Sequence, residues 1–222
     1  MKHATMPRLA LAVMVAGAFA VKAPATFAQH ARLTRPEDLG LLEGPDRADW
    51  QQPERVMDAL QIGDGSVVAD LGAGAGWFTV RLARRVGPTG RVYAEDVQPQ
   101  MIEAIQRRVA RELLRNVVPR LGRPTDPLLP ANTLDAVLIV DAYHEVEQPV
   151  MLLTNVRKAL KPDGRLGIIN FTKEGGGPGP PIADRVDPDR VIRDAKAAGF
   201  GLKSRETFLR YEYLLIFEPA SQ

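Results

Sequence analysis

The stretch Val67-Val68-Ala69-Asp70-Leu71-Gly72-Ala73-Gly74-Ala75-Gly76-Trp77-Phe78 decides the fold. It predicts a short buried strand, a glycine-rich turn and the start of a helix. The three glycines have no Cβ atom, so a ligand can approach the backbone closely and a positive φ costs little. The free N–H groups of the following helix would point into that site. The spacing G-x-G-x-G, preceded by Asp70, differs from the G-x-G-x-x-G of dinucleotide-binding proteins, which disfavours an NAD-dependent dehydrogenase.

Strand-like and helix-like segments alternate along the chain on both sides of this turn. The apolar patterns predict strands at 66–70, 91–95, 117–121, 134–140 and 164–170, and helices at 53–60, 77–86, 99–114, 149–160 and 187–198. Such alternation gives a mostly parallel sheet with helices on both faces. The last two strand-like segments, 202–207 and 211–217, are separated by three residues. That connection is too short for a parallel crossover, so we expect an antiparallel hairpin.

Composition limits the chemistry that this chain can perform. Its 222 residues are 45% hydrophobic and 25% charged, which is ordinary for one globular domain. Cysteine is absent, which excludes disulfides, a thiolate nucleophile and a thiolate metal site. Only three histidines are present, so we expect no metal centre.

The first residues predict a secretory signal peptide. Lys2 and Arg8 precede an uncharged apolar run at 9–21, and small residues follow it. We expect cleavage after Ala28, with Ala25 as the alternative, and export to the periplasm or the medium. The run is short for a membrane span, which needs about 20 residues. The alternatives are an uncleaved membrane anchor and a wrongly assigned start.

The expected mature chain is nearly neutral. Removal of residues 1–28 takes away Lys2, Arg8 and Lys22, which leaves 26 basic and 27 acidic residues. No dense basic patch remains, so we expect no nucleic-acid partner. After cleavage of the leader, we also expect no stable membrane span. Residues 29–49 are polar and predict an irregular N-terminal arm, and residues 50–222 form the expected single domain.

Four motifs in order resemble the class I S-adenosylmethionine-dependent methyltransferases, in the UbiE-like methyltransferase-domain group. Residues 69–76 (ADLGAGAG) are similar to the family's acid-x-G-x-G-x-G motif, and residues 92–101 (VYAEDVQPQM) to its second-strand segment. Residues 134–137 (LDAV) and 160–166 (LKPDGRL) are similar to its fourth strand and its "LKPGG" turn. The resemblance spans about residues 50–219. It implies a Rossmann-like, doubly wound, seven-stranded sheet whose last strand is antiparallel.

The resemblance also implies roles for residues around S-adenosyl-L-methionine. Asp70 resembles the acid near the methionine amino group, although it could simply cap the turn, and Gly72, Gly74 and Gly76 resemble the glycines that lie against the cofactor. Asp96, 20 residues after Gly76, matches the acid that binds the ribose hydroxyls.

Two positions near these motifs leave alternatives open. Glu95 could take the ribose role after a slip of one residue. Many relatives have Gly-Asp after the third strand, whereas here Gly122 is followed by Arg123. Asp126 is the nearest acid for an adenine contact, and it could also be only an Asp-Pro turn residue.

Residues 141–145 (DAYHE) stand where the family faces methionine and substrate. Asp141 is therefore a candidate cofactor contact. His144 is a candidate general base, because histidine titrates near neutral pH, or a structural residue. Tyr143 could line the substrate pocket or pack in the core. Trp50, with its neighbour Gln51, could close over the cofactor or seal the sheet edge.

The resemblance therefore implies methyl transfer to a small-molecule acceptor. The methyl donor is already activated, and the protein mainly aligns the reacting groups, so no nucleophilic triad is needed. The alternative is an exported, non-catalytic protein that keeps the fold and binds S-adenosylmethionine or a related ligand. Export raises this possibility because S-adenosylmethionine is made in the cytoplasm. The sequence does not indicate an oligomeric state.

Overall fold

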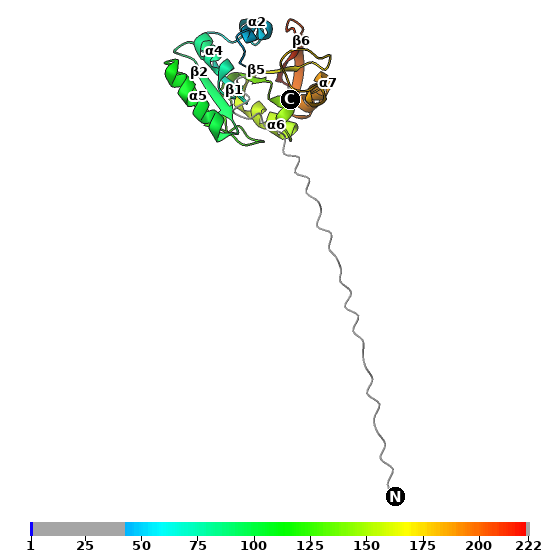
Figure 1. The fold of residues 1–222 in the computed structure, drawn as a ribbon. Coiled ribbons are helices and arrows are strands. Elements are labelled where there is room, and N and C mark those ends of the chain that lie inside the picture. Colours follow the sequence, from blue (N-terminus) through cyan, green and yellow to red (C-terminus); the bar gives the residue numbers. More distant parts are fainter. Residues whose placement is uncertain (2–42, 221–222) are drawn as a thin grey trace.

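The computed structural model describes Met1 and residues 43–220, which contain one seven-stranded sheet (Figure 1). The strands lie in the order β3-β2-β1-β4-β5-β7-β6. All neighbouring pairs are parallel except β5 with β7 and β6 with β7, so β7 alone runs against the others. This confirms the expected Rossmann-like sheet with its antiparallel C-terminal strand. The strands are β1 (Val67–Leu71), β2 (Arg91–Asp96), β3 (Val117–Leu121), β4 (Leu134–Val140), β5 (Leu160–Phe171), β6 (Phe200–Glu206) and β7 (Glu212–Pro219).

Helices separate most of the strands, as the alternating pattern predicts. Three of the longer helices, α5, α6 and α7, begin with proline, whose fixed φ suits the first helical position. The helix α4 begins after Gly76, which takes φ +82° at its N-cap. The helices are α2 (Arg47–Gln51), α3 (Pro53–Ala59), α4 (Trp77–Val86), α5 (Pro99–Arg111), α6 (Pro149–Ala159) and α7 (Pro188–Ala197), with short 3-10 turns η2 (Tyr143–Glu145) and η3 (Ile182–Asp184).

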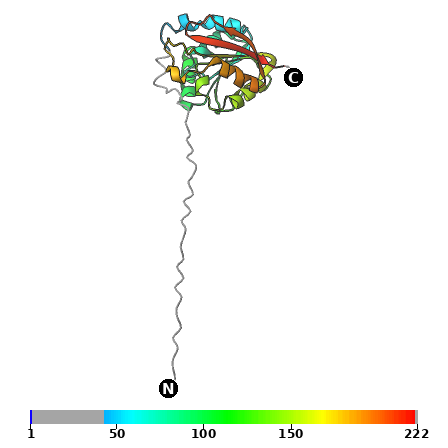
Figure 2. The same ribbon diagram turned by 90° about the vertical axis from the view of Figure 1, so that its right-hand side faces the viewer.

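Two apolar layers cover the two faces of the sheet. Successive side chains of a strand point to opposite faces, and β1 shows this directly. Ala69 and Leu71 pack in the layer that contains α6 and α7, whereas Val68 packs in the layer that contains α3 and α4. In Figure 2, the red strand β7 lies between the cyan N-terminal helices and the orange helix α7. The central strands are therefore buried on both sides.

The order of the strands determines where a ligand can bind. The neighbours of β1 are β2 on one side and β4 on the other, so the chain reverses its direction of travel across the sheet at β1. Ligands of open α/β sheets bind beside such a switch point, at the carboxyl ends of the strands. The glycine turn follows the carboxyl end of β1 and therefore lies in this crevice.

Two local expectations are wrong. Residues 47–49, assigned to an irregular arm, belong to helix α2, which packs against the domain through buried Arg47, Trp50 and Gln51. Strand β5 begins at Leu160 rather than at residue 164, because Leu160 pairs with Leu134 before the register of the two strands shifts. The predicted leader, 1–28, and residues 29–42 of the predicted arm lie outside the described residues, Met1 apart.

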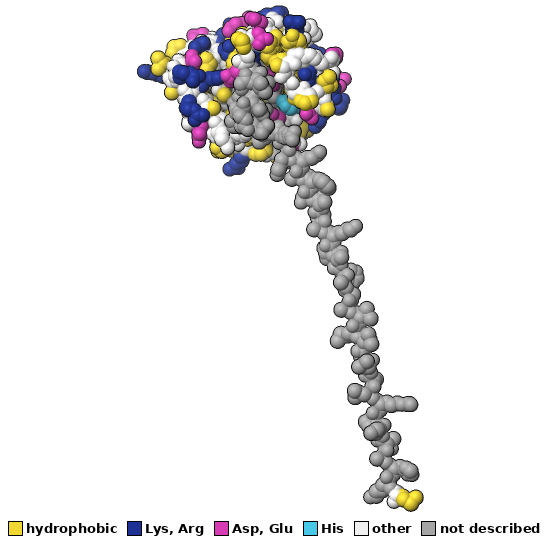
Figure 3. All heavy atoms as spheres, in the orientation of Figure 1, with side chains coloured by type: hydrophobic (Ala, Val, Ile, Leu, Met, Phe, Trp, Pro, Cys, Tyr) yellow, Lys and Arg dark blue, Asp and Glu magenta, His cyan; other side chains and the backbone are white. Residues whose placement is uncertain are grey.

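The described surface carries both signs of charge. On the face that Figure 3 shows, Lys and Arg side chains are interspersed with Asp and Glu side chains. Over the described part of the chain, none of the helices combines the length and the apolar character that a membrane crossing requires.

Candidate functional site

A cavity of about 410 Å³ lies at the carboxyl ends of β1, β2 and β4. This volume is within the range of roughly 300–1,000 Å³ that is usual for small-molecule sites. Six of the residues singled out from the sequence share its lining, namely Asp70, Gly72, Gly74, Glu95, Asp96 and Asp141. Its apolar wall is formed by Leu71, Trp77, Phe78, Met101, Ile139, Val140, Val146 and Leu152.

The glycine turn forms one side of the cavity in a left-handed conformation that favours glycine. Gly72 and Gly74 have φ values of +69° and +54°. The next residue after Gly72, Ala73, donates its N–H to the carbonyl oxygen of Glu95 at 2.9 Å, which ties the turn to β2. A Cβ atom on Gly72 would lie 2.5 Å from the Cβ of Ala142, so the turn and the end of β4 touch closely.

We expect the substitution Gly72→Ala to destabilise the protein. The left-handed conformation costs a residue with a side chain about 1–2 kcal/mol, and overpacking against Ala142 adds about 1–3 kcal/mol. Urea unfolding of both proteins measures the loss. Gly201→Ala is the matched control, because a Cβ at Gly201 meets no atom within 4 Å. Equal midpoints for Gly72→Ala and the parent would contradict this account of the turn.

Asp96 lies at the end of β2 and joins two elements around the cavity. Its Oδ2 accepts a hydrogen bond from the Gly74 N–H at 3.0 Å, and its Oδ1 accepts one from the Gln98 N–H at 2.9 Å. Burial raises the pKa of this carboxyl, while the bonds from the backbone of Gln98 and Gly74 lower it. Each carboxylate oxygen has a further lone pair, so Asp96 can still accept two hydroxyl groups of a ligand.

Glu95 also reaches the cavity, although it precedes Asp96 in the strand. Burial and the neighbouring charge of Asp96 raise the pKa of Glu95 to about 8, and a hydrogen bond from the backbone of Gly72 partly opposes this shift. Gly122 makes room for the buried carboxyl, because a Cβ at that position would lie 1.7 Å from Glu95 Oε1. Glu95 is thus held inside the wall of the cavity, between the glycine turn and the end of β3.

Asp70 lies under the same turn, at the end of β1. Its Oδ2 accepts a hydrogen bond of 2.6 Å from the Thr79 hydroxyl, which anchors the strand to helix α4. Burial raises the pKa of Asp70 to about 6, against the lowering effect of Thr79 and of the charge on Arg47. The carboxyl also lines the cavity, so it can face a ligand while it holds the helix in place.

Asp141 directly follows the last residue of β4 and lines the cavity there. Its Oδ2 accepts a hydrogen bond of 3.1 Å from the side-chain amide of Gln51, and the same amide donates to Glu212 Oε1 at 2.9 Å. The guanidinium of Arg47 lies 3.9 Å from Asp141 Oδ2. Burial raises the pKa of Asp141, and the charge of Arg47 lowers it. Helix α2, which the sequence did not predict, therefore supplies two of the partners of this acid.

Five other predicted residues do not appear among the lining residues of the cavity. Trp50 packs against Phe171 and Tyr211, with ring centroids 5.7 and 6.2 Å apart. The hydroxyl of Tyr143 donates to Asp194 of helix α7 at 3.0 Å, away from the cavity, and burial raises its pKa. The substrate-pocket roles of Trp50 and Tyr143 stay predictions.

The remaining three residues have local structural contacts. The carboxyl of Asp126 accepts a hydrogen bond from the Leu128 N–H at 2.9 Å, as an Asp-Pro turn residue would. Gly76 begins helix α4. His144 lies in η2 with its Nε2 3.8 Å from Glu145 Oε1. The adenine contact of Asp126 and the general-base role of His144 remain predictions.

Among the residues absent from the sequence-based candidates, three bear directly on the acids of the site. Arg47 lines the cavity, and its guanidinium lies 4.3 Å from the ring centroid of Trp77. Thr79 supports Asp70, and Glu212 shares Gln51 with Asp141. Of these three residues, only Glu212 could have been found from the sequence. It is an acid at the start of the apolar segment 211–217, where burial of a carboxyl group would suggest a functional or structural role.

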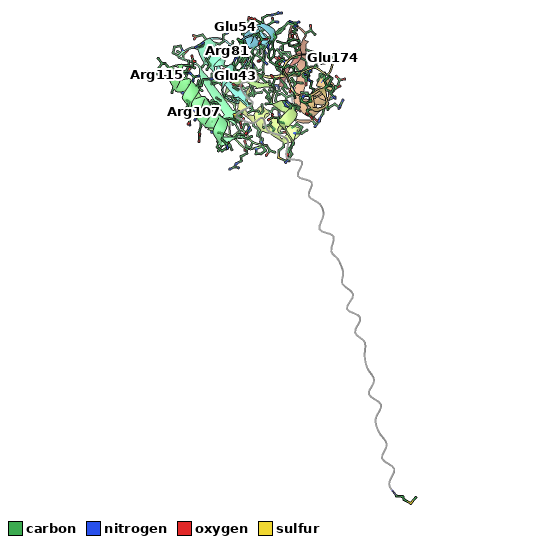
Figure 4. The ribbon with its side chains drawn as sticks, in the orientation of Figure 1. Glu43, Glu54, Arg81, Arg107, Arg115 and Glu174 are labelled. Carbon is green, nitrogen blue, oxygen red and sulfur yellow. The ribbon has the colours of Figure 1, made fainter. Side chains whose placement is uncertain are left out.

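Further charged residues also line the cavity. Glu43, labelled in Figure 4, lines the cavity and accepts a hydrogen bond of 3.0 Å from Arg108 of helix α5. Seven acids and two arginines line the cavity in the described part of the chain. Among the described residues, no group of three or more His, Asp or Glu side chains is arranged to hold a metal ion.

Comparison with known proteins is consistent with this geometry. The family model described as "Methyltransferase domain" matches residues 68–164, from β1 to the beginning of β5. The ubiquinone/menaquinone biosynthesis C-methyltransferase UbiE of Pasteurella multocida is 34% identical over 124 residues, 53% of this chain and 44% of that protein. An uncharacterized methyltransferase of Mycobacterium tuberculosis is 32% identical over 154 residues, 64% of this chain and 56% of that protein. The chain thus spans about half the length of these relatives.

A solved structure extends the similarity beyond the residues of the domain match. The crystal structure of a SAM-dependent methyltransferase from Aquifex aeolicus superposes with a TM-score of 0.80 and 28% identity. The match covers 84% of this chain and all of that one. The domain match, the relatives and the fold together support a class I S-adenosylmethionine-dependent methyltransferase, with S-adenosyl-L-methionine as its cofactor.

Proposed function

We propose that this chain catalyses methyl transfer from S-adenosylmethionine to a small-molecule acceptor. The observation that carries the proposal is the meeting of the glycine turn, Asp96 and the end of β4 around one cavity at the switch point of the sheet. The cofactor supplies a methyl group that is already activated on a sulfonium sulfur. The protein then has to bind the two reactants, align them and exclude water.

The residues present fit this cofactor. The turn at Gly72 and Gly74 lets a ligand approach the backbone where a side chain would obstruct it. Asp96, already fixed by two backbone N–H groups, has acceptor capacity left for the two ribose hydroxyls. Glu95 is the neighbouring alternative, held deeper in the wall by Gly72. We infer that Asp96 holds the ribose.

The charge of the cavity favours a cationic ligand. Asp70, Asp96 and Asp141 converge on it, and the lining acids exceed the two lining arginines even when Glu95, whose pKa is about 8, is counted as neutral. Partly buried acids attract a positive charge more strongly than exposed acids, because little water screens them. A sulfonium is such a charge, and its neutral product, a thioether, is not. This difference favours binding of the methyl donor and release of its product.

The acceptor that we propose is a small, partly apolar molecule. The cavity of about 410 Å³ has an apolar wall and a few convergent polar groups, as small-molecule sites generally do. The part of the cavity beside Asp141 and Val146, at the end of β4, would take the acceptor, since Asp96 and the glycine turn would hold the cofactor.

Calorimetric titration with S-adenosylmethionine and S-adenosylhomocysteine, followed by an assay of S-adenosylhomocysteine formation over a panel of acceptors, tests the proposal. We expect saturable binding of both ligands, and turnover with at least one acceptor that carries an O–H, N–H, S–H or acidic C–H group. Binding without turnover on any acceptor would favour the non-catalytic alternative. Absence of binding to either ligand would refute the cofactor site and the enzyme together.

We also propose that the protein is exported, on the basis of its N-terminal sequence alone. The charged start, the uncharged run at 9–21 and the small residues before position 28 support a cleaved leader. Mass spectrometry of the protein purified from its native host gives the mature N-terminus. A mature chain that begins at Gln29, or at Thr26 for the alternative cleavage after Ala25, supports export. A chain that retains residues 1–28 contradicts cleavage and supports the anchored alternative or a wrongly assigned start.

A further inference from the structure

Two buried acids, Asp141 and Glu212, meet behind one wall of the cavity. They come from distant parts of the chain, the end of β4 and the start of β7. The side chain of Asp141 is 7% exposed, and Glu212 is 2% exposed. Asp141 lines the cavity, whereas Glu212 is not among its lining residues. One acid of the pair therefore faces a ligand, and the other supports it from within the protein.

Helix α2 fixes the orientation of both carboxyl groups. The Arg47 Nε donates to Gln51 Oε1 at 2.6 Å, so the oxygen of this side-chain amide is engaged and its nitrogen must face the acids. The two N–H groups of that nitrogen then serve Asp141 Oδ2 at 3.1 Å and Glu212 Oε1 at 2.9 Å. A single amide thus holds one oxygen of each carboxyl group.

The other oxygen of each acid lacks a donor. Asp141 Oδ1 and Glu212 Oε2 are buried, and no N–H or O–H group of the described residues donates to them. An orphaned buried acceptor costs free energy, and two carboxylates side by side repel each other. The two carboxyl groups lie side by side, because the same Gln51 nitrogen donates to both of them. One proton shared between them supplies the missing donor and removes the repulsion.

The groups around Asp141 and Glu212 favour a pair that keeps one proton. Burial and the charge of Asp141 raise the pKa of Glu212 well above its ordinary value, and burial raises that of Asp141. The opposing positive charges are Arg47 of α2 and, when protonated, His144 of η2. Tyr213 of β7 feels the charge of Asp141 and has a raised pKa, chiefly because it is buried, so it stays neutral. With one proton, the pair carries a single negative charge beside Arg47.

We propose that Asp141 and Glu212 form the proton-accepting pair of this cavity: binding of the cationic methyl donor displaces their shared proton to the solvent, and the pair regains a proton from the acceptor during methyl transfer. The inference rests on the function proposed above. In the transfer, the acceptor's lone pair forms the new bond to the methyl carbon, and the electrons of the broken carbon–sulfur bond stay on sulfur. The proton that the acceptor loses passes to Asp141, which shares it with Glu212. Charge and atoms then balance.

This arrangement assigns different roles to the two acids. Asp141 is the catalytic residue, since it alone of the pair lines the cavity. Glu212 and Gln51 are positioning residues that set the proton affinity and the orientation of Asp141. The acceptor class that fits is a neutral molecule that must lose a proton when it is methylated. An acceptor that becomes a stable cation on methylation would need no such pair.

Proton counting during ligand binding tests the inference without an acceptor. Calorimetric titrations in buffers of different ionisation enthalpy give the number of protons released. At pH 7, we expect S-adenosylmethionine to release more protons than S-adenosylhomocysteine, by up to about one proton for each molecule bound, since a nearby positive charge favours the ionised pair. Equal proton numbers for the two ligands would overturn the pair and leave the cofactor site intact. No binding of either ligand would overturn both.

If the two ligands release different numbers of protons, variants show which carboxyl group holds the released proton. In Glu212→Gln and Asp141→Asn, one carboxyl is replaced by an amide of the same shape, so we expect the difference between the two ligands to vanish in each. Glu218→Gln, at the far end of β7, removes an equivalent carboxyl and is expected to retain the difference. Glu95→Gln is the decisive comparison, because Glu95 is another buried acid on the cavity. Loss of the difference in Glu95→Gln, and its survival in Glu212→Gln, would overturn the assignment.

Discussion

Replacing Asp96 with alanine is expected to weaken the binding of S-adenosylmethionine by about 1–3 kcal/mol, which raises Kd roughly 5- to 150-fold. Hydrogen bonds to a charged group are stronger than those to a neutral one, and Asp96 is the acid best placed to accept two ribose hydroxyls. The change also leaves the N–H groups of Gly74 and Gln98 without their acceptor. Isothermal titration calorimetry of the variant and its parent measures the effect.

Two controls separate a direct contact from a loss of structure. Asp163→Ala removes an exposed acid near the amino end of β5, at the opposite edge of the sheet, and should leave the affinity unchanged. Asp96→Asn keeps the shape and one acceptor oxygen, so its loss of affinity should be intermediate. If Asp96→Ala binds S-adenosylmethionine as tightly as its parent, Asp96 does not hold the ribose, and Glu95 becomes the candidate.

The second large effect is a dependence of stability on pH that arises from Glu95. Its pKa is raised from an ordinary value of 4.5 to about 8 in the folded protein. The folded state therefore binds the Glu95 proton more tightly than the unfolded state does. The free energy of unfolding that Glu95 contributes is highest below pH 4.5 and falls as pH rises to about 8. The slope is at most about 1.4 kcal/mol for each pH unit.

Glu95→Gln isolates this contribution from those of the other buried acids. Glutamine stays neutral, so the free energy of unfolding of the variant, measured relative to its parent, should increase between pH 5 and about pH 8. Urea unfolding at several pH values gives that difference directly. Glu206→Gln, in β6 and away from the cavity, serves as the matched control. A constant difference between Glu95→Gln and its parent across this range would mean that Glu95 is already ionised in the folded protein.

The sheet and the acids at the carboxyl ends of β1, β2 and β4 could be predicted from local sequence signals. The apolar run of β4 and the glycine turn after β1 determine their structures locally, and the short connection before β7 requires an antiparallel strand. The carboxyl ends of parallel strands meet at one edge, which brings Asp70, Asp96 and Asp141 together once the strands are known. These inferences needed only periodicity and chain geometry.

Helix α2 could not be predicted in the same way. It has five residues, and its N-cap, Asp46, makes no side-chain capping bond. Such a short helix is stabilised by its tertiary contacts rather than by its own propensity. Arg47 and Gln51 therefore reach the site through long-range bonds, including the one from Gln51 to Glu212 across 161 residues. Trp50 was expected at the cavity or the sheet edge, and its actual partners, Phe171 and Tyr211, likewise lie far along the chain.

The reversed direction of β7 has a consequence for how this fold can diversify. Because the strand runs against its neighbours, its first residue, Glu212, pairs with Phe171 at the last position of β5 and so arrives at the ligand-binding edge. The family match ends at residue 164, before this strand begins. In the function proposed above, the glycine turn and Asp141 thus lie within the matched stretch, whereas Glu212, the positioning acid of the pair, lies outside it. If the proposed pair is correct, we expect that exchanging β6 and β7 between proteins of this fold changes which acceptors lose a proton readily and leaves the binding of the methyl donor unchanged.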